Sequence, residues 1–213
     1  MDGAESIGQG IAGGRAALDR ALLHVVLHEP EIPNNTGNIG RTCVALASAL
    51  HLIEPLGFDI SEKACRRAGL DYWPRLALAT HADWAAYRGA TPGVRRWLFT
   101  ARAGRSIFDA EIRVGDHLVF GKESVGLPNE VLDEAGTPSA RGGSDETRLV
   151  CLPMVEGERS LNVATAVCAA MYEAIRQMAA RGEARIEPGP RGIVLRPPGA
   201  LPNAHPGGPA GPF

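Results

Sequence analysis

Apolar residues of this chain gather in short runs that polar, glycine- or proline-containing turns separate. Short apolar runs of this kind, bounded by turn residues, are typical of strands that are buried on both faces. The runs that predict such strands are residues 22–29, 50–55, 95–101, 116–121 and 147–154.

Helical spacing of apolar residues marks two longer segments. Residues 38–50 and 160–180 each place their apolar side chains on one face of a helix. Ser160 is the predicted N-cap of the second helix, and residues 61–70 predict a shorter helix. Alternating strands and helices indicate an α/β domain with a mostly parallel sheet.

Composition divides the 213 residues into one domain with a segment on either side. Residues 1–20 are rich in Gly and Ala without a clear period and predict a flexible leader, while residues 21–180 form the predicted domain. Residues 181–213 are dense in Pro and Gly, and we expect them to be disordered because they bury too little apolar surface to offset their ordering entropy. A polar insert at residues 136–147 predicts an exposed loop.

The charge balance disfavours some classes of function. A formal net charge of -2 is a poor fit to a protein that grips nucleic acid through bulk charge, although local basic patches stay possible. No pair of the cysteines forms a CxxC motif, so neither a zinc site nor a disulfide framework is indicated, and no metal is expected. No run reaches the roughly 18 apolar residues that a membrane span needs. Acidic residues stand where a signal peptide would carry positive charge, so a cytoplasmic protein is expected.

Three polar stretches with glycines follow predicted strands: residues 33–42, 120–130 and 152–167. Parallel strands bring their carboxyl ends to one edge of a sheet, where ligands bind in open α/β folds. The sequence therefore predicts that the three stretches share a pocket. The GxGxxG match at residues 8–13 carries little weight because no strand precedes it.

Several linked motifs resemble a known family. "EPEIPNNTGNIGRTC", "FGKESVGLP" and "LPMVEGERSLNVATAV" resemble the SPOUT methyltransferases, and more narrowly the TrmL (YibK-like) tRNA 2'-O-methyltransferases. The resemblance implies an α/β-knot fold with a deep C-terminal trefoil knot that binds S-adenosylmethionine. It also implies a homodimer, with a site shared across the interface, that methylates the ribose of the wobble nucleotide, cytidine or uridine 34, in the anticodon stem-loop of tRNA.

By position, the resemblance implies cofactor contacts at Thr100, Gly121, Glu123, Leu152, Ser160 and Asn162. Glu123 either binds backbone donors that shape the knot or is a solvated charge. Asn162 either fixes loop geometry or reaches the active site.

The catalytic loop implied by the resemblance is Asn35–Arg41. A guanidinium stays protonated in proteins, so we expect Arg41 to hold the substrate phosphate and to stabilise developing oxyanion charge rather than to act as a base. Asn38 would orient the ribose, cap a helix, or do both. Asn35 is the third residue expected to take part in catalysis.

Local basic clusters are the expected contacts with tRNA. One cluster comprises Lys63, Arg66 and Arg67, together with Arg75, and a second comprises Arg95, Arg96, Arg102 and Arg105. Each cluster either binds phosphate or forms salt bridges on the surface.

Three alternative functions stay open at this point. The chain could be a SPOUT 2'-O-methyltransferase that acts on ribosomal RNA or on another tRNA position. It could be a non-catalytic RNA-binding module, or an oxidoreductase that uses residues 8–13.

Overall fold

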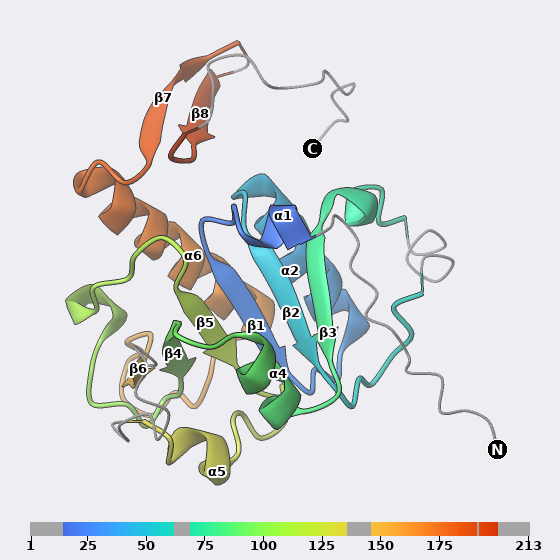
Figure 1. The fold of residues 1–213 in the computed structure, drawn as a ribbon. Coiled ribbons are helices and arrows are strands. Elements are labelled where there is room, and N and C mark those ends of the chain that lie inside the picture. The colour runs from blue at the N-terminus through green and yellow to red at the C-terminus, as the bar shows by residue number, and fades with distance from the viewer. Residues whose placement is uncertain (1–14, 62–68, 136–145, 191, 200–213) are drawn as a thin grey trace, which may run out of the picture.

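The computed structural model describes residues 15–61, 69–135, 146–190 and 192–199. A sheet of six parallel strands, in the order β3-β2-β1-β5-β4-β6, forms its centre (Figure 1). The strands are β1 (His24–His28), β2 (Ala49–Ile53), β3 (Ala77–His81), β4 (Arg95–Phe99), β5 (His117–Phe120) and β6 (Glu146–Val150). The helices that accompany the sheet are α1 (Arg15–Leu18), α2 (Pro33–Ala45), α4 (Trp84–Ala90), α5 (Asn129–Leu132) and α6 (Val163–Ala180), with 3-10 turns at Trp73–Arg75 and Ile107–Asp109.

Helices cover both faces of the sheet, which gives the three layers visible in Figure 1. One face packs against α2 and α6 in a cluster that includes Leu27, Ile39 and Met171. The other face packs against α4 and α5 in a smaller cluster that includes Val26 and Val131. The central strands are therefore buried on both faces, which explains their nearly continuous apolar sequence. Among the described residues, no helix has the length and apolarity to cross a bilayer.

The strand order changes direction between β1 and β5. From β1 the chain adds β2 and then β3 on one side, whereas β5, β4 and β6 lie on the other. All six strands are parallel, so their carboxyl ends meet at one edge, and a ligand site is expected at the point where the order reverses. The predicted α/β class with a mostly parallel sheet is confirmed, and the threading of a knot stays a prediction.

Helix α2 corrects the expected helix boundary. The polar stretch was predicted to be a loop before a helix at residue 38, but the helix already begins at Pro33. Proline is favoured in the first helical turn because its missing N–H would have no intrahelical acceptor there. Asn38 consequently lies inside α2, where its carbonyl accepts a hydrogen bond from the Thr42 hydroxyl at 3.0 Å, so its predicted capping role is wrong.

Gly40 lets α2 pack closely against Trp73 and Leu76. A Cβ added to Gly40 would lie 3.1 Å from a ring carbon of Trp73 and 3.2 Å from a methyl carbon of Leu76. The Tyr72 hydroxyl donates a short hydrogen bond to the Gly37 carbonyl. The absence of a side chain at Gly40 thus lets α2 approach the segment that follows residue 69, and tertiary packing outweighs the low helix propensity of glycine at this position.

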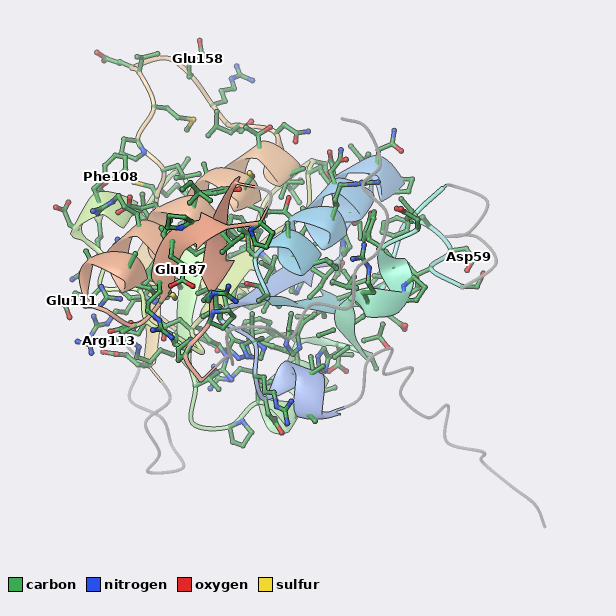
Figure 2. All side chains as sticks on the ribbon, turned by 90° about the horizontal axis from the view of Figure 1, so that it is seen from above. Asp59, Phe108, Glu111, Arg113, Glu158 and Glu187 are labelled. Carbon is green, nitrogen blue, oxygen red and sulfur yellow. The ribbon has the colours of Figure 1, made fainter. Side chains whose placement is uncertain are left out.

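The carboxyl end of the described chain corrects another expectation. Residues 181–213 were predicted to be disordered, but β7 (Arg185–Gly189) and β8 (Gly192–Arg196) form an antiparallel hairpin. Ladder hydrogen bonds and an ion pair between Glu187, labelled in Figure 2, and Arg196 hold this hairpin. The composition of this segment did not predict the hairpin, because two strands can pair through backbone hydrogen bonds without an apolar run. Residues 1–14 and 200–213, most of the predicted helix 61–70 and most of the 136–147 insert lie outside the described residues, so the expectation for residues 200–213 stays a prediction.

Candidate active site

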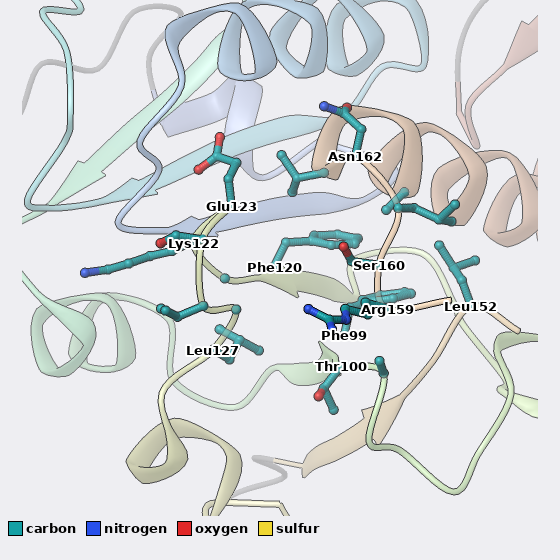
Figure 3. A pocket seen from close by; sticks show the side chains of 18 of the residues that line it. Phe99, Thr100, Phe120, Lys122, Glu123, Leu127, Leu152, Arg159, Ser160 and Asn162 are labelled. Carbon is teal, nitrogen blue, oxygen red and sulfur yellow. The ribbon is translucent and has the colours of Figure 1, made fainter. Parts of the chain in front are cut away.

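A cavity of about 830 Å³ opens at the carboxyl edge of the sheet. The segments that follow β1, β4, β5 and β6 line it, and so does the beginning of α6 (Figure 3). The three polar stretches that were expected to share a pocket each contribute residues to it. The six residues expected to contact a cofactor all line this cavity: Thr100, Gly121, Glu123, Leu152, Ser160 and Asn162.

One part of the cavity is apolar and flat. The rings of Phe99 and Phe120 are stacked, with centroids 4.4 Å apart and planes 13° apart. Leu127, Leu152 and Val163 complete this lining. Sequence reasoning did not single out the two Phe residues, although each is the last residue of its strand and thus lies at the edge where ligands bind. A planar heterocycle fits such a surface because aromatic and aliphatic side chains bury its faces.

Gly121 allows the wall after β5 to fold tightly. A Cβ added there would lie 2.0 Å from the carbonyl carbon of Gly126 and 2.2 Å from the backbone nitrogen of Leu127. Reciprocal backbone hydrogen bonds between Lys122 and Gly126, 3.2 and 2.9 Å long, close the loop. Gly126 itself has a φ of 75°, which favours glycine. Only glycine at position 121 fits this wall.

A carboxylate joins this wall to the segment after β1. Glu123 accepts hydrogen bonds from the backbone nitrogens of Glu31 (2.8 Å) and Ile32 (3.3 Å) and from the Asn35 amide (3.0 Å). In return, the Glu31 carboxylate accepts a bond from the backbone nitrogen of Ser124 at 3.0 Å. Burial acts to raise the pKa of Glu123, but these hydrogen bonds outweigh it and lower the pKa. Of the two interpretations of Glu123, the binding of backbone donors is confirmed.

The same network continues to α6. Asn35 accepts a hydrogen bond from the Asn162 amide at 3.0 Å, and Asn162 accepts bonds from the backbone nitrogens of Ala164 and Thr165. Asn162 is therefore the N-cap of α6, and the prediction of Ser160 in that role is wrong. The asparagine fits because its carbonyl oxygen caps the helix while its amide group reaches the cavity wall. Asn162 thus fixes the geometry of the loop before α6 and also lines the cavity, as its two interpretations expected.

Arg159 is a cavity residue that sequence reasoning missed. Figure 3 shows its side chain directed into the cavity. It belongs to the loop between β6 and α6, which projects from the body of the protein with Glu158 near its tip (Figure 2). A basic residue immediately before the predicted helix was the available signal. Its guanidinium offers fork-shaped donors to an anionic ligand.

The expected catalytic residues are not all brought together. Asn35 lines the cavity, but Asn38 and Arg41 do not belong to its described lining. Arg41 is exposed, with its guanidinium 4.6 Å from the Tyr72 ring centroid and 3.7 Å from the Asp71 carboxylate. Helix geometry places Arg41 about 9 Å farther along α2 than Asn35 and about 120° around it. Within one subunit, Arg41 therefore faces a different direction from the cavity.

The structure treats the residues of the two basic clusters differently: some are not described, some are paired within the protein, and some are exposed. Lys63, Arg66 and Arg67 lie outside the described residues. Arg95 forms an ion pair with Asp116 at 2.5 Å, and Arg96 is only 1% exposed and donates to Thr91. The possible role of Arg95 and Arg96 in RNA binding is wrong because both guanidinium groups are committed to the protein. Arg102 and Arg105 are exposed, and their contact with tRNA stays a prediction.

Comparisons with known proteins agree with this geometry. The SpoU rRNA Methylase family matches residues 22–172. A tRNA (cytidine(34)-2'-O)-methyltransferase of Saccharophagus degradans is 39% identical over 161 residues, which cover 76% of this chain and 99% of the relative.

Solved structures of RNA methyltransferases are also similar to this chain. One that concerns the 2-OH methylation of C/U34 on tRNA is 46% identical, with a TM-score of 0.66, and the match covers 76% of this chain and 99% of that one. The SpoU methyltransferase AviRb of Streptomyces viridochromogenes, in complex with the cofactor AdoMet, is 25% identical with a TM-score of 0.59. That match covers 76% of this chain and 62% of the other.

Proposed function

Because the chain belongs to the SpoU rRNA Methylase family, we propose that it methylates the ribose 2'-hydroxyl of nucleotide 34 in tRNA, with S-adenosylmethionine as donor. The observation that carries the proposal is the cavity at the carboxyl edge of the sheet, where all six expected cofactor residues meet. The match to nearly the full length of a cytidine-34 methyltransferase favours tRNA over ribosomal RNA as substrate.

The cavity fits the cofactor. Phe99, Phe120 and Leu152 offer a flat apolar surface for an adenine ring, and Gly121 allows the tight loop whose backbone forms one wall of the cavity. S-adenosylmethionine supplies an electrophilic methyl group when it is bound. The hydrogen bonds of Glu123, Asn35 and Asn162 hold three walls in place before the ligand arrives, which lowers the cost of ordering on binding.

Arg41 acts on the substrate in this proposal. Its guanidinium binds the phosphate next to the reacting ribose and stabilises negative charge as the 2'-hydroxyl loses its proton. The proton passes to that phosphate, because a guanidinium stays protonated. Asn38, on the exposed side of α2, orients the ribose through its amide.

A homodimer completes the site in this proposal. Arg41 does not face the cavity of its own subunit, so we assign it to the cavity of the partner subunit across a two-fold interface. Three large apolar side chains at the cavity rim support the proposal: Ile32 is 44%, Leu161 45% and Val125 77% exposed. A partner that covers this rim would bury them.

The RNA is the anticodon stem-loop, whose unstacked bases expose the ribose of nucleotide 34. We assign its phosphates to the cluster Lys63, Arg66 and Arg67, to the exposed Arg102 and Arg105, and to Arg159 in the cavity. The enzyme works in the cytoplasm in this proposal.

The test is methylation of purified tRNA with labelled S-adenosylmethionine, followed by mapping of the modified nucleoside. We expect label at nucleotide 34, and no label on a matched tRNA that carries a 2'-deoxyribose there. Label at another position or only in ribosomal RNA would support the alternative substrates. Absence of cofactor binding in calorimetry would support a non-catalytic RNA-binding module.

A further inference from the structure

Four histidines from four strands gather on the face of the sheet that α4 covers. They are His24 of β1, His51 of β2, His81 of β3 and His117 of β5. Strand register brings them together, because His24 pairs directly with His117 while His51 lies opposite Val26, two residues farther along β1. The side chains of residues two apart point to the same face of a sheet.

Three of these rings converge on one point. One ring nitrogen from each of His24, His51 and His117 lies within 4.8 Å of the other two. Nδ1 of His24 and Nε2 of His51 are 2.9 Å apart. Ligands of a tetrahedral Zn²⁺ with bonds of about 2.0–2.1 Å lie about 3.3–3.4 Å from one another. The 2.9 Å pair would have to open by about 0.4–0.5 Å, and separations of up to 4.8 Å would have to close by at most about 1.5 Å, which side-chain rotations can supply.

We propose that His24, His51 and His117 form a binding site for one divalent transition-metal ion of the Zn²⁺ class. Imidazole nitrogen suits Zn²⁺ and its first-row neighbours, whereas Mg²⁺ and Ca²⁺ prefer oxygen ligands. Three protein ligands leave the fourth position of the ion for water.

The second ring nitrogens of the two most buried ligands already have partners. Nδ1 of His51 is 3.0 Å from Nε2 of His81, and Nδ1 of His117 is 2.7 Å from the Tyr87 hydroxyl. Metal-bound histidines almost always donate their other N–H in this way, which fixes the tautomer and the ring orientation. With Nδ1 engaged, Nε2 is the nitrogen of each ring that is left for the proposed ion. His81 and Tyr87 are therefore positioning residues.

The environment keeps the ligands in the form that binds metal. Burial lowers the pKa of His24 to about 4 and holds the pKa values of His51 and His117 well below the ordinary value. All three imidazoles are consequently neutral at pH 7, so an ion need not displace a charge-bearing proton from them. Two charges act on the ligands: the carboxylate of Asp19 favours a cation near His24, whereas the guanidinium of Arg96, the cross-strand neighbour of His117, opposes one.

This site is separate from the methyltransferase cavity. His24 and His117 are the first residues of β1 and β5, whereas the cavity lies where these strands end. No short motif marks this site, because its three ligands belong to three separate strands. The histidines become neighbours only through strand register.

The experiment uses the full chain without a histidine tag, stripped of metal by a chelator. Zn²⁺ is titrated in competition with a chromophoric chelator, and native mass spectrometry counts the bound ions. We expect one Zn²⁺ per chain and no competition by Mg²⁺. Loss of a supporting hydrogen bond to a metal ligand costs about 10–100-fold in affinity, so we expect at least about 100-fold from His24→Gln and about 10-fold from Tyr87→Phe.

His28→Gln is the matched control. His28 is a buried histidine on the same strand and the same face as His24, but it does not belong to the three ligands. Its variant should bind Zn²⁺ like the wild type. Wild-type protein that binds no Zn²⁺ at micromolar concentration, or a folded His24→Gln variant with unchanged affinity, would overturn the proposal.

A chemical readout covers the case in which a variant does not fold. Diethyl pyrocarbonate modifies accessible imidazoles, and His24 is the only one of the three proposed ligands that is partly exposed. We expect bound Zn²⁺ to protect His24 in the wild type. Equal modification with and without Zn²⁺ would contradict the proposed ligand set.

Discussion

Replacement of Gly121 by alanine tests whether the tight loop after β5 shapes the cofactor cavity. The added Cβ would lie 2.0 Å from the Gly126 carbonyl carbon, whereas ordinary contacts begin at 3.4 Å, so the loop must move by about 1.4 Å. The three nearest atoms are backbone atoms, so no rotamer change can relieve the clash. Such overpacking costs about 1–3 kcal/mol, and each hydrogen bond of the Lys122–Gly126 pair that breaks costs about 0.5–1.5 kcal/mol more.

The loop is a cavity wall, so we expect most of this cost to appear in ligand binding. A loss of about 2–4 kcal/mol corresponds to a fall of about 30- to 700-fold in affinity for S-adenosylmethionine, measured by calorimetry. Circular dichroism and thermal unfolding establish that the variant is folded, with an expected fall in Tm of about 2–4 °C for each kcal/mol lost.

Gly104→Ala is the matched control for this prediction. Gly104 lies in the loop after the neighbouring strand β4, and a Cβ added there meets nothing within 4 Å. We expect its affinity to stay within about twofold of the wild type, since neither a clash nor a positive φ opposes the side chain. A folded Gly121→Ala variant that binds the cofactor as the wild type does would refute the reasoning about this wall.

Four other changes test the remaining parts of the site. Arg41→Ala should lower methyl transfer at least about 100-fold in a labelled-cofactor assay, while calorimetry shows cofactor affinity within about twofold. The carboxylate of Glu123, with its lowered pKa, stabilises the fold above pH 4.5, and this contribution is lost as pH falls through the folded-state pKa; urea unfolding of Glu123→Gln should show a shallower loss in acid. Asn162→Ala should lose about 1–3 kcal/mol in urea unfolding, because a helix cap and a side-chain hydrogen bond disappear together. Gly40→Ala should lower Tm despite better helix propensity, since its Cβ meets aromatic and leucine side chains, whereas Gly89→Ala in α4 meets nothing and should raise it; a higher Tm for Gly40→Ala would contradict the packing argument.

The strands that the sequence predicted are those with continuous apolar runs. β1, β2, β4 and β5 were expected because strands buried on both faces carry mostly apolar residues. β6 is a half-exposed edge strand, and it was expected because an apolar run follows Arg148. β3 was missed because its sequence, ALATH, contains small residues with low strand propensity. It pairs as an edge strand, where backbone hydrogen bonds to β2 supply what its side chains do not.

The chemistry of the site followed from the sequence, but its geometry did not. Thr100, Gly121 and Asn162 were expected at the cavity from the resemblance to the SPOUT methyltransferases, and all three line it. The direction of Arg41 depends on where α2 begins, and Pro33 moved that point by five residues. The histidine cluster depends on the register of separate strands, which no local pattern encodes.

The hydrogen bonds that join Asn35, Glu123 and Asn162 have a consequence for synthesis of the protein. Asn35 bonds to partners 88 and 127 residues farther along the chain. A nascent polypeptide can therefore form β1 and α2 early on the ribosome, but it cannot assemble the complete cavity until α6 has emerged and docked. The cofactor can therefore bind only after translation has passed α6, and a truncated product that ends before Asn162 would lack a complete cavity.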